Sequence, residues 1–254
     1  MTGKIISAAL SDIGPLKEIN QDSFFHAIRE DEDSCAAVFA VADGVSGSSH
    51  GEVASGICAA ELKKWWENVF PQVKDDKSKT IQAMAEFIIS VNQTVCETLL
   101  PNKGRSATTL TVLLLLGSEW IVFNVGDSRV YRLKSRLFSK LEQLTEDQTC
   151  LVEREYQGRK YLKSVLTSCI GGRNRLEYQY ASGTLLDGDR FLICSDGVYK
   201  TQTTRQMGKI LGKRGRSPEQ LCQDFIRAAL SNGENDNITA VTAIYTAGGE
   251  GRRD

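Results

Sequence analysis

The chain has 254 residues, of which 41% are hydrophobic and 25% are charged, as in an ordinary globular protein. Its formal net charge is −1, so no overall positive field would attract nucleic acid or an anionic membrane. The N-terminal residues contain no secretory pattern, and the longest apolar region, 110–125, is broken by Gly117, Ser118 and Glu119. We therefore expect neither a secretion signal nor a membrane span.

Cysteine and histidine usage narrows the compartment and the metal chemistry. The seven cysteines are odd in number, form no C-x-x-C pair and lie mostly in apolar runs, which is typical of buried free thiols in a reducing compartment. We therefore expect a cytoplasmic protein. The chain has two histidines, His26 and His50, so a His-rich zinc site is excluded. Any bound metal is expected to be a hard ion with oxygen ligands, such as Mg²⁺ or Mn²⁺.

The first third of the chain predicts three strands and a long helix. Strands are expected at Lys4–Leu10, Ser23–Ile28 and Cys35–Ala42, and the charged run Arg29–Asp33 is expected to form an exposed hairpin tip. Apolar residues then recur at helical spacing over Gly51–Phe70. This pattern predicts a helix that Ser48 and Ser49 can cap and that Pro71 ends.

A second helix and a block of strands follow. The loop Lys74–Lys79 leads to a helix expected at Ile81–Leu100. Residues 106–145 then form four β-like runs with tight turns between them, which predicts an antiparallel meander. A short helix is expected at Thr145–Gln157, and a basic loop follows it.

The last third alternates strands and helices. Strands are expected at Leu176–Gly183 and Arg190–Ser195, with a turn at Asp187-Gly188-Asp189 joining them as a hairpin. Two helices are expected next, and Asn237–Tyr245 alternates in the manner of a final strand. The two helical segments are Arg205–Lys213 and Pro218–Leu230.

This order of elements predicts an α/β protein of the α+β type, with two antiparallel sheets face to face and helices outside them. Such a molecule is a four-layer α-β-β-α sandwich. The sequence contains no repeat and no linker, and the final strand is expected to pair with the first strands. We therefore expect a single domain over residues 1–246, followed by a disordered tail at 247–254.

Five acidic residues share one setting, because each follows or ends a strand-like run. One Asp-Gly dipeptide alone is better explained as a turn, but the pattern recurs along the chain. Strand ends at one edge of a sandwich converge, and carboxylates brought that close repel one another unless a counter-ion is present. A pair of divalent cations would resolve the repulsion and would suit phosphoryl chemistry. The five residues are Asp22, Asp43, Asp127, Asp196 and Asp236. Asp187-Gly188-Asp189 contains the same dipeptide and is expected to be a turn without a chemical role.

Eight sequence segments together resemble the metal-dependent protein phosphatases of the PP2C (PPM) family in their bacterial form. They occur in family order from about residue 7 to 245, and they are SDIGPLKEINQDSF, VADGVSGSSHGEVAS, SATTLTVLLL, VGDSRVYRL, LTEDQT, SVLTSCIGG, GDRFLICSDG and ENDNITAVTAIY. The resemblance implies the α-β-β-α sandwich. It also implies hydrolysis of phosphoserine or phosphothreonine in proteins by a metal-bridging hydroxide, without a phosphoenzyme. The expected role is to reverse the action of a bacterial Ser/Thr kinase.

The resemblance also assigns roles to the acidic residues. It implies that Asp43 bridges two metal ions, Mn²⁺ or Mg²⁺, and that the Gly44 carbonyl binds one of them. Asp196 and Asp236 would complete the metal held with Asp43. Asp22 would hold the other metal through waters, and Asp127 would bind a third, weaker metal. Asp43 and Asp22 are thus the expected catalytic residues. The expected partners are phosphorylated protein substrates and a cognate Ser/Thr kinase, with neither nucleic acid nor a membrane, and the enzyme itself is expected to be a monomer.

Some positions depart from the family pattern. Lys17 stands where relatives usually have arginine, and we expect it to bind the substrate phosphate; the alternative is a solvated lysine beside Glu18. Gln148 stands where relatives have histidine, and the segment after it is shorter than the family flap. His50 is a candidate proton donor, with an exposed first-turn histidine as the alternative. A catalytically weak phosphoprotein-binding module therefore remains the competing hypothesis.

Overall fold

Two five-stranded antiparallel sheets form the centre of the protein. The computed structural model describes residues 3–31, 35–45, 50–98, 106–135, 140–156, 158–172 and 176–248. The first sheet has the strand order β1 (Lys4–Asp12), β12 (Ile238–Thr246), β11 (Arg190–Cys194), β6 (Arg129–Leu133) and β7 (Glu142–Gln143). The second has the order β10 (Gln179–Thr184), β5 (Glu119–Val125), β4 (Leu110–Leu116), β3 (Cys35–Asp43) and β2 (Asp22–Glu30).

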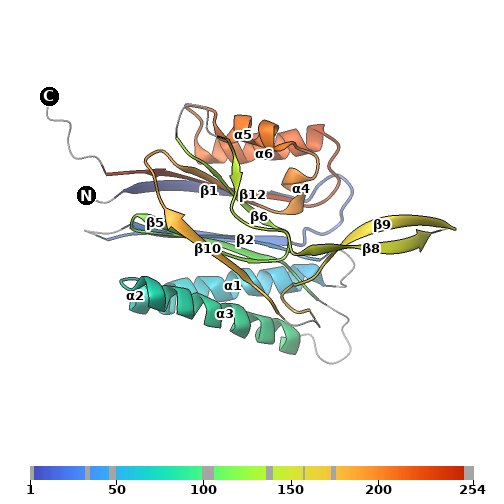
Figure 1. Cartoon of the computed structure of the whole chain (residues 1–254), viewed down its shortest axis with the longest axis horizontal. Coiled ribbons are helices and arrows are strands. Elements are labelled where there is room, and N and C mark those ends of the chain that lie inside the picture. The colour runs from blue at the N-terminus through green and yellow to red at the C-terminus, as the bar shows by residue number, and fades with distance from the viewer. Residues whose placement is uncertain are drawn as a thin grey trace.

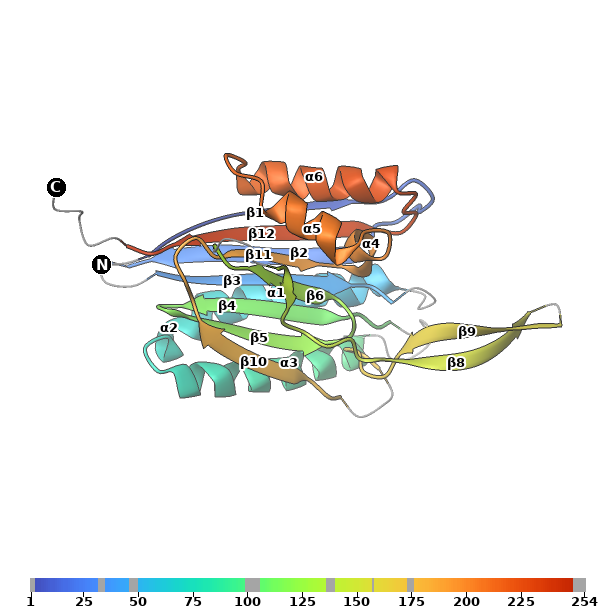
Figure 2. The same ribbon diagram turned by 45° about the horizontal axis from the view of Figure 1, so that its top comes forward.

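Helices cover the outer face of each sheet (Figures 1 and 2). The second sheet packs against α1 (Gly51–Asn68), α2 (Phe70–Val73) and α3 (Lys77–Thr98). The first sheet packs against α4 (Asp196–Tyr199), α5 (Thr204–Leu211) and α6 (Pro218–Ser231). The expected four-layer α-β-β-α sandwich is confirmed.

Strand β3 explains why the layers hold together. Its side chains alternate between two apolar cores, so that Val38 packs toward α1 and α3 while Phe39 and Val41 pack toward the opposite sheet. A strand covered on both faces is apolar throughout, as this one is. Asp43 continues the alternation on the face that looks toward the other sheet.

The two ends of the chain meet in the first sheet. β1 and β12 pair antiparallel from Lys4 opposite Thr246 to Asp12 opposite Ile238. The prediction that the final strand pairs with the first is confirmed. This pairing fixes the start of β12, and with it Asp236, beside the segment that follows β1.

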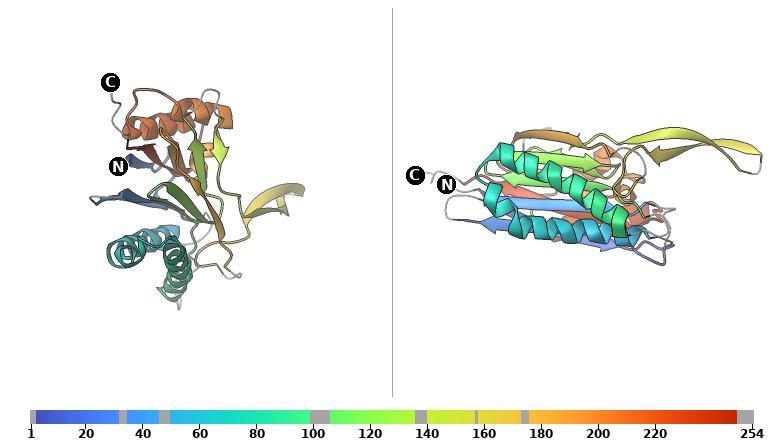
Figure 3. Two further views of the ribbon diagram at one scale, coloured as in Figure 1. Left: turned by 60° about the vertical axis from the view of Figure 1, so that its left-hand side comes forward. Right: turned by 90° about the horizontal axis from the view of Figure 1, so that it is seen from below.

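The region after Thr145 differs from the prediction. Residues predicted as a short helix and a basic loop form instead the hairpin of β8 (Thr149–Tyr156) and β9 (Arg159–Leu166), a separate two-stranded sheet. The hairpin projects from one end of the sandwich (Figures 1, 2 and 3). Both faces of the hairpin carry charged residues, so its sequence lacks the alternation of apolar and polar residues by which a strand is recognised.

Two connections predicted as hairpins cross between the sheets. β5 and β6 belong to different sheets, as do β10 and β11, so the predicted meander is wrong beyond β5. The turn at Asp187-Gly188-Asp189 therefore lies in a crossover and is not a hairpin tip. Alternating strands report burial but not which sheet they join, which is why the sequence could not distinguish these cases.

The helix boundaries need smaller corrections. Pro71 does not end the helical segment, because it lies in the first turn of α2, where its missing N–H costs no hydrogen bond. α3 begins at Lys77, within the predicted loop. The predicted caps Ser48 and Ser49, the hairpin tip at residues 32–33 and the tail from residue 249 lie outside the described residues. No helix in the described ranges is long and apolar enough to cross a membrane.

Candidate active site and family

Four of the five predicted carboxylates line one pocket of about 430 Å³ at one end of the sandwich. Asp43 ends β3, Asp127 lies in the β5–β6 crossover, Asp196 begins α4 directly after β11, and Asp236 precedes β12. The pocket therefore receives carboxylates from both sheets. Its other lining residues are Val45, Thr109, Asp147, Thr149, Lys163, Ser164, Val165, Leu166, Tyr199 and Lys200.

The fifth carboxylate, Asp22, lies behind this pocket and does not line it. Asp22 stands opposite Asp43 in the β2–β3 register. Its Oδ2 accepts hydrogen bonds from Ser195 Oγ at 2.7 Å and from Thr239 Oγ1 at 2.7 Å, two hydroxyls of the other sheet. Burial raises the pKa of Asp22 to about 6, although both hydrogen bonds act to lower it. Asp22 thus joins the two sheets directly beneath the pocket.

Two glycines explain how the chain brings these carboxylates together. A Cβ on Gly44 would lie 2.7 Å from the Gln21 carbonyl oxygen, and a Cβ on Gly197 would lie 2.1 Å from the Asn237 carbonyl oxygen. Neither approach is possible for a residue with a side chain. Gly197 therefore lets α4 start against the beginning of β12, which places Asp196 near Asp236.

Burial and mutual repulsion disfavour the ionised form of several of these groups. The pKa of Asp43 is well above its ordinary value, first because the group is buried and then because Asp22 and Asp196 are close. Burial and then the charge of Asp196 raise the pKa of Asp127 to about 6. The pKa of Asp196 is also raised, mainly by burial. No described residue donates a hydrogen bond to the Asp43 carboxylate.

Two lysines supply opposite charge at the pocket. Lys17 Nζ lies 2.6 Å from Asp236 Oδ1, so the predicted approach of Lys17 to the carboxylates is seen in the structure. Lys200 pairs with Asp196 one turn earlier on the same helical segment. Sequence reasoning missed Lys200, although its spacing of four residues from Asp196 was a usable signal.

An ion pair and a cation–π contact hold one wall of the pocket in place. Arg129 Nε donates to Asp147 Oδ1 at 2.8 Å, and the guanidinium carbon lies 3.5 Å from the centre of the Tyr199 ring. The Tyr199 hydroxyl donates to the Asp127 carbonyl oxygen at 2.9 Å. The GDSR segment that contains Asp127 could also be explained as a hairpin turn, but β5 and β6 lie in different sheets, so Asp127 does not cap a hairpin.

The two histidine-related positions occupy different settings. His50 precedes α1 as its N-cap residue, is partly buried, and does not line the pocket. Its Nδ1 is buried without a hydrogen-bond partner among the described residues. Gln148, at the position where relatives have histidine, accepts a hydrogen bond from Gly126 N at 2.7 Å and donates to the Glu177 carbonyl. Gln148 therefore has a structural role beside the crossover that carries Asp127.

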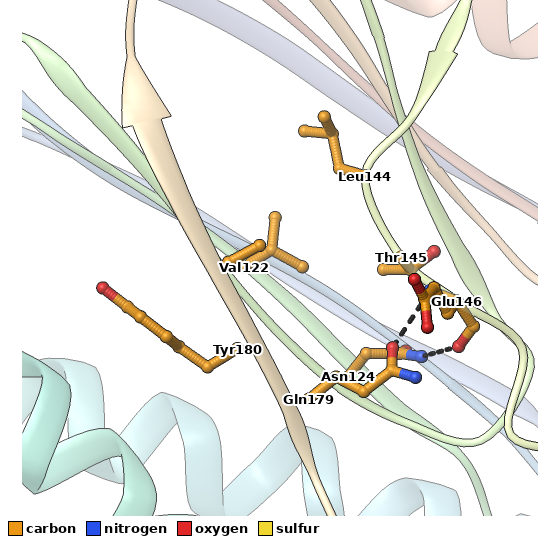
Figure 4. A pocket seen from close by; sticks show the side chains of 8 residues that line it. Val122, Asn124, Leu144, Thr145, Glu146, Gln179 and Tyr180 are labelled. Atoms are coloured by element: carbon orange, nitrogen blue, oxygen red, sulfur yellow. Dashed lines mark hydrogen bonds between the residues drawn. The ribbon is translucent and has the colours of Figure 1, made fainter.

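A second pocket of about 300 Å³ lies at the open edge of the sandwich (Figure 4). Glu146 N donates to Gln179 Oε1 at 3.0 Å, and Asn124 Nδ2 donates to the Glu146 carbonyl at 3.4 Å. Glu146 is the one ionisable carboxylate lining it. The acidic side chains therefore concentrate in the other pocket, which the four predicted carboxylates and Asp147 line.

Comparison with known proteins decides the family. A model of the protein phosphatase 2C family matches residues 17–236. The chain belongs to the protein phosphatase 2C family. It is a serine/threonine protein phosphatase by family, and this family is metal-dependent.

Relatives and solved structures agree with this membership. The serine/threonine phosphatase stp of Listeria monocytogenes is 28% identical over 244 residues, covering 91% of this chain and 92% of its own. PstP of Mycobacterium tuberculosis is 26% identical over 93% of this chain and 44% of its own length. A Streptococcus agalactiae serine/threonine phosphatase shares the fold, with a TM-score of 0.78, 24% identity and 94% and 99% coverage. So does the PstP catalytic domain in complex with two manganese ions, with a TM-score of 0.73, 24% identity and 95% and 98% coverage.

The donor atoms that line the pocket are of the chemical type that the metal ions of a PP2C-family enzyme prefer. The four predicted carboxylates and Asp147, which is paired with Arg129, line the pocket, and no described histidine or cysteine does. Such an oxygen donor set matches Mg²⁺ or Mn²⁺. In the arrangement that the structure shows, the described residues contain no group of three Asp, Glu, His or Cys side chains close enough to hold one metal ion. Asp236 and Asp196 are instead paired with Lys17 and Lys200. The donor set therefore fits a divalent ion, provided that these ammonium groups can move away.

Proposed function

We propose that this chain hydrolyses phosphoserine and phosphothreonine in proteins, and that the four-carboxylate pocket is its active site. The observation that supports the proposal most strongly is the convergence of Asp43, Asp127, Asp196 and Asp236 on one cavity from both sheets. Buried carboxylates that repel one another are costly without a counter-ion. A binding module without catalysis would have no reason to keep all four.

The proposed metal ligands follow from position. Asp43, Asp196, Asp236 and the Gly44 carbonyl would hold the two core ions, and Asp127 would hold a third. Asp22 would act from beneath, through water. When bound, Mn²⁺ or Mg²⁺ would polarise the phosphate and lower the pKa of water at the site.

The chain's own residues would then bind and orient the substrate. In hydrolysis, a water oxygen forms a bond to phosphorus, the bond from phosphorus to the serine or threonine oxygen breaks, and that oxygen takes up a proton. Lys17 lies at the pocket and could donate to phosphate oxygens once it leaves Asp236. Lys200 and Lys163 also line the pocket and carry the same charge. His50 remains a predicted proton donor.

Phosphate release from matched peptides tests the proposal. The protein, with Mn²⁺ present, should release phosphate from phosphoserine and phosphothreonine peptides, release little from a phosphotyrosine peptide, and lose activity in EDTA. Restoring Mn²⁺ should restore turnover. Binding of phosphopeptides without phosphate release under any of these conditions would favour the binding-module hypothesis. Full turnover after exhaustive chelation would overturn the metal requirement.

The source of the substrates, the cellular location and the oligomeric state of the enzyme are also proposals. Protein-bound phosphoserine and phosphothreonine are made by protein kinases, so a Ser/Thr kinase is the expected source of its substrates. Seven cysteines, all free in the structure, suit a reducing compartment and support the cytoplasm as the location. A monomer remains the expected state.

A further inference from the structure

The hairpin β8–β9 has two chemically different faces. Residues directly opposite in an antiparallel pair lie on one face, and alternate residues lie on opposite faces. The register pairs Arg154 with Tyr161 and Tyr156 with Arg159. One face, the cationic face, consists of Cys150, Val152, Arg154, Tyr156, Arg159, Tyr161, Lys163 and Val165; the other consists of Thr149, Leu151, Glu153, Glu155, Lys160, Leu162, Ser164 and Leu166.

The charges separate between these faces. The cationic face carries Arg154, Arg159 and Lys163 and no acidic residue. The opposite face carries two glutamates and Lys160, and Lys160 Nζ pairs with Glu153 at 2.9 Å. Within the described part of the chain, no carboxylate forms an ion pair with the three basic side chains of the cationic face. These side chains are exposed and can meet a ligand.

The cationic face continues into the active-site pocket. Lys163 and Val165 line the four-carboxylate cavity at the base of the hairpin, as do Thr149, Ser164 and Leu166 of the opposite face. Lys163 is the charged side chain among these five, and it belongs to the cationic face. Strands rise about 3.3 Å per residue, so the row from Lys163 to Arg159 extends about 13 Å outward. An extended peptide has nearly the same rise. A substrate whose phosphate enters the pocket could therefore place residues up to about four positions away along this row.

We propose that the cationic face of the hairpin binds acidic residues that flank the phosphorylated residue of the substrate. The inference rests on the proposed function and adds its preferred substrate class. A pocket lined by carboxylates repels an acidic peptide, and the arginines offset this repulsion outside the pocket. Tyr161 and Tyr156, opposite them in the register, add exposed aromatic surface to the same face.

Two phosphothreonine peptides, one with glutamates and one with glutamines at the flanking positions, test the inference. We expect wild-type protein with Mn²⁺ to show a higher kcat/KM for the acidic peptide. Arg159→Gln and Arg154→Gln should each reduce this preference about 1.5- to 5-fold, the range of exposed ion pairs. The preference should also shrink as ionic strength rises from about 0.05 to 0.5 M, because salt screens exposed charges.

Lys160→Gln is the matched control, since it removes the same charge from the adjacent residue on the opposite face. It should leave the preference unchanged. Equal effects of Arg159→Gln and Lys160→Gln, or no preference in the wild type, would overturn the inference. Peptide affinity, followed by fluorescence anisotropy, gives the preference independently of turnover. Preference without phosphate release would overturn the proposed function and leave this inference standing.

Discussion

Lys17 illustrates how one side chain can serve two groups in turn. Its Nζ lies 2.6 Å from Asp236 Oδ1, and both side chains are about one-third exposed or less. The same ammonium group can neutralise a proposed metal ligand or donate to a substrate phosphate, but not both at full strength. Metal affinity and substrate affinity should therefore respond to Lys17 in opposite directions.

We expect Lys17→Ala to bind Mn²⁺ more tightly, because Asp236 loses its competing cation, and to show a higher KM for a phosphopeptide. The KM increase should be on the order of tenfold, near the lower end of a charged hydrogen bond. Calorimetric Mn²⁺ titration and steady-state kinetics measure the two effects. Lys17→Arg should keep the low KM. If metal affinity and KM both match those of the exposed control Lys63→Ala, Lys17 binds neither group.

Asp22 provides a pH-dependent prediction for the chelated protein. Burial raises its pKa from 3.8 to about 6, so the folded state holds a proton that the unfolded chain releases at lower pH. Its contribution to the free energy of unfolding is therefore present below about pH 4 and is lost as pH rises through about 6. Asp22→Asn, which keeps an oxygen acceptor for Ser195 and Thr239, should avoid this loss.

Urea unfolding in EDTA at several pH values measures this difference. Asp22→Asn should gain stability relative to wild type between about pH 4 and 7, by up to the order of 3 kcal/mol. The exposed substitution Glu67→Gln serves as the control. A stability difference that does not change with pH would show that Asp22 titrates normally.

At the residue scale, sequence reasoning predicted which carboxylates converge but not what neutralises them. Asp43, Asp127, Asp196 and Asp236 were recognisable because each ends or borders a strand-like run. Lys200 was missed although it follows Asp196 by four residues, because that spacing is informative only once a helix is known to begin at Asp196. The position of Asp22 beneath the pocket depends on Ser195 and Thr239, contacts between residues more than 170 positions apart.

Among the connecting elements, the β10–β11 crossover gives a stability prediction. Asp189 is fully buried and accepts a hydrogen bond from Arg132 Nε at 2.9 Å, while Arg132 also donates to the Thr184 carbonyl. Removing one partner of a buried pair leaves the other charge uncompensated, at a cost of about 3–5 kcal/mol. The turn expected to lack a chemical role thus contributes a buried ion pair to the fold.

Asp189→Ala should lower the free energy of unfolding by this amount while leaving kcat of the folded protein nearly unchanged. Asp187→Ala, two residues earlier on the exposed side of the turn, should change stability by less than about 0.5 kcal/mol. Urea unfolding compares the two variants. Equal stability losses would mean that the turn backbone, and not the ion pair, holds the crossover.

The sequence predicted the positions of helices and strands correctly where burial produces a regular pattern of apolar residues. β3, buried on both faces, and α6, with its Ser217 cap and Pro218 in the first turn, could be placed within a residue or two. The hairpin β8–β9 could not, because its charged faces contact no core. The sheet membership of β6 and β11 depends on contacts across the sandwich, which no local pattern encodes.

For the whole molecule, the sandwich itself creates the site. β3 and β5 end in the second sheet, β11 ends and β12 begins in the first, and their ends meet at one edge (Figure 2). Neither sheet alone carries the four carboxylates. These groups are therefore expected to act together, so that the loss of one carboxylate abolishes turnover without loss of the fold.

Phosphate release from a phosphothreonine peptide by Asp43→Asn, at saturating Mn²⁺, tests this claim most directly. We expect turnover to disappear, and Asp236→Asn to behave alike. Thermal unfolding in EDTA should show a fold as stable as wild type or more so, because a repelling charge is gone. Near-normal phosphate release by a folded Asp43→Asn protein would contradict the account and place the active site elsewhere.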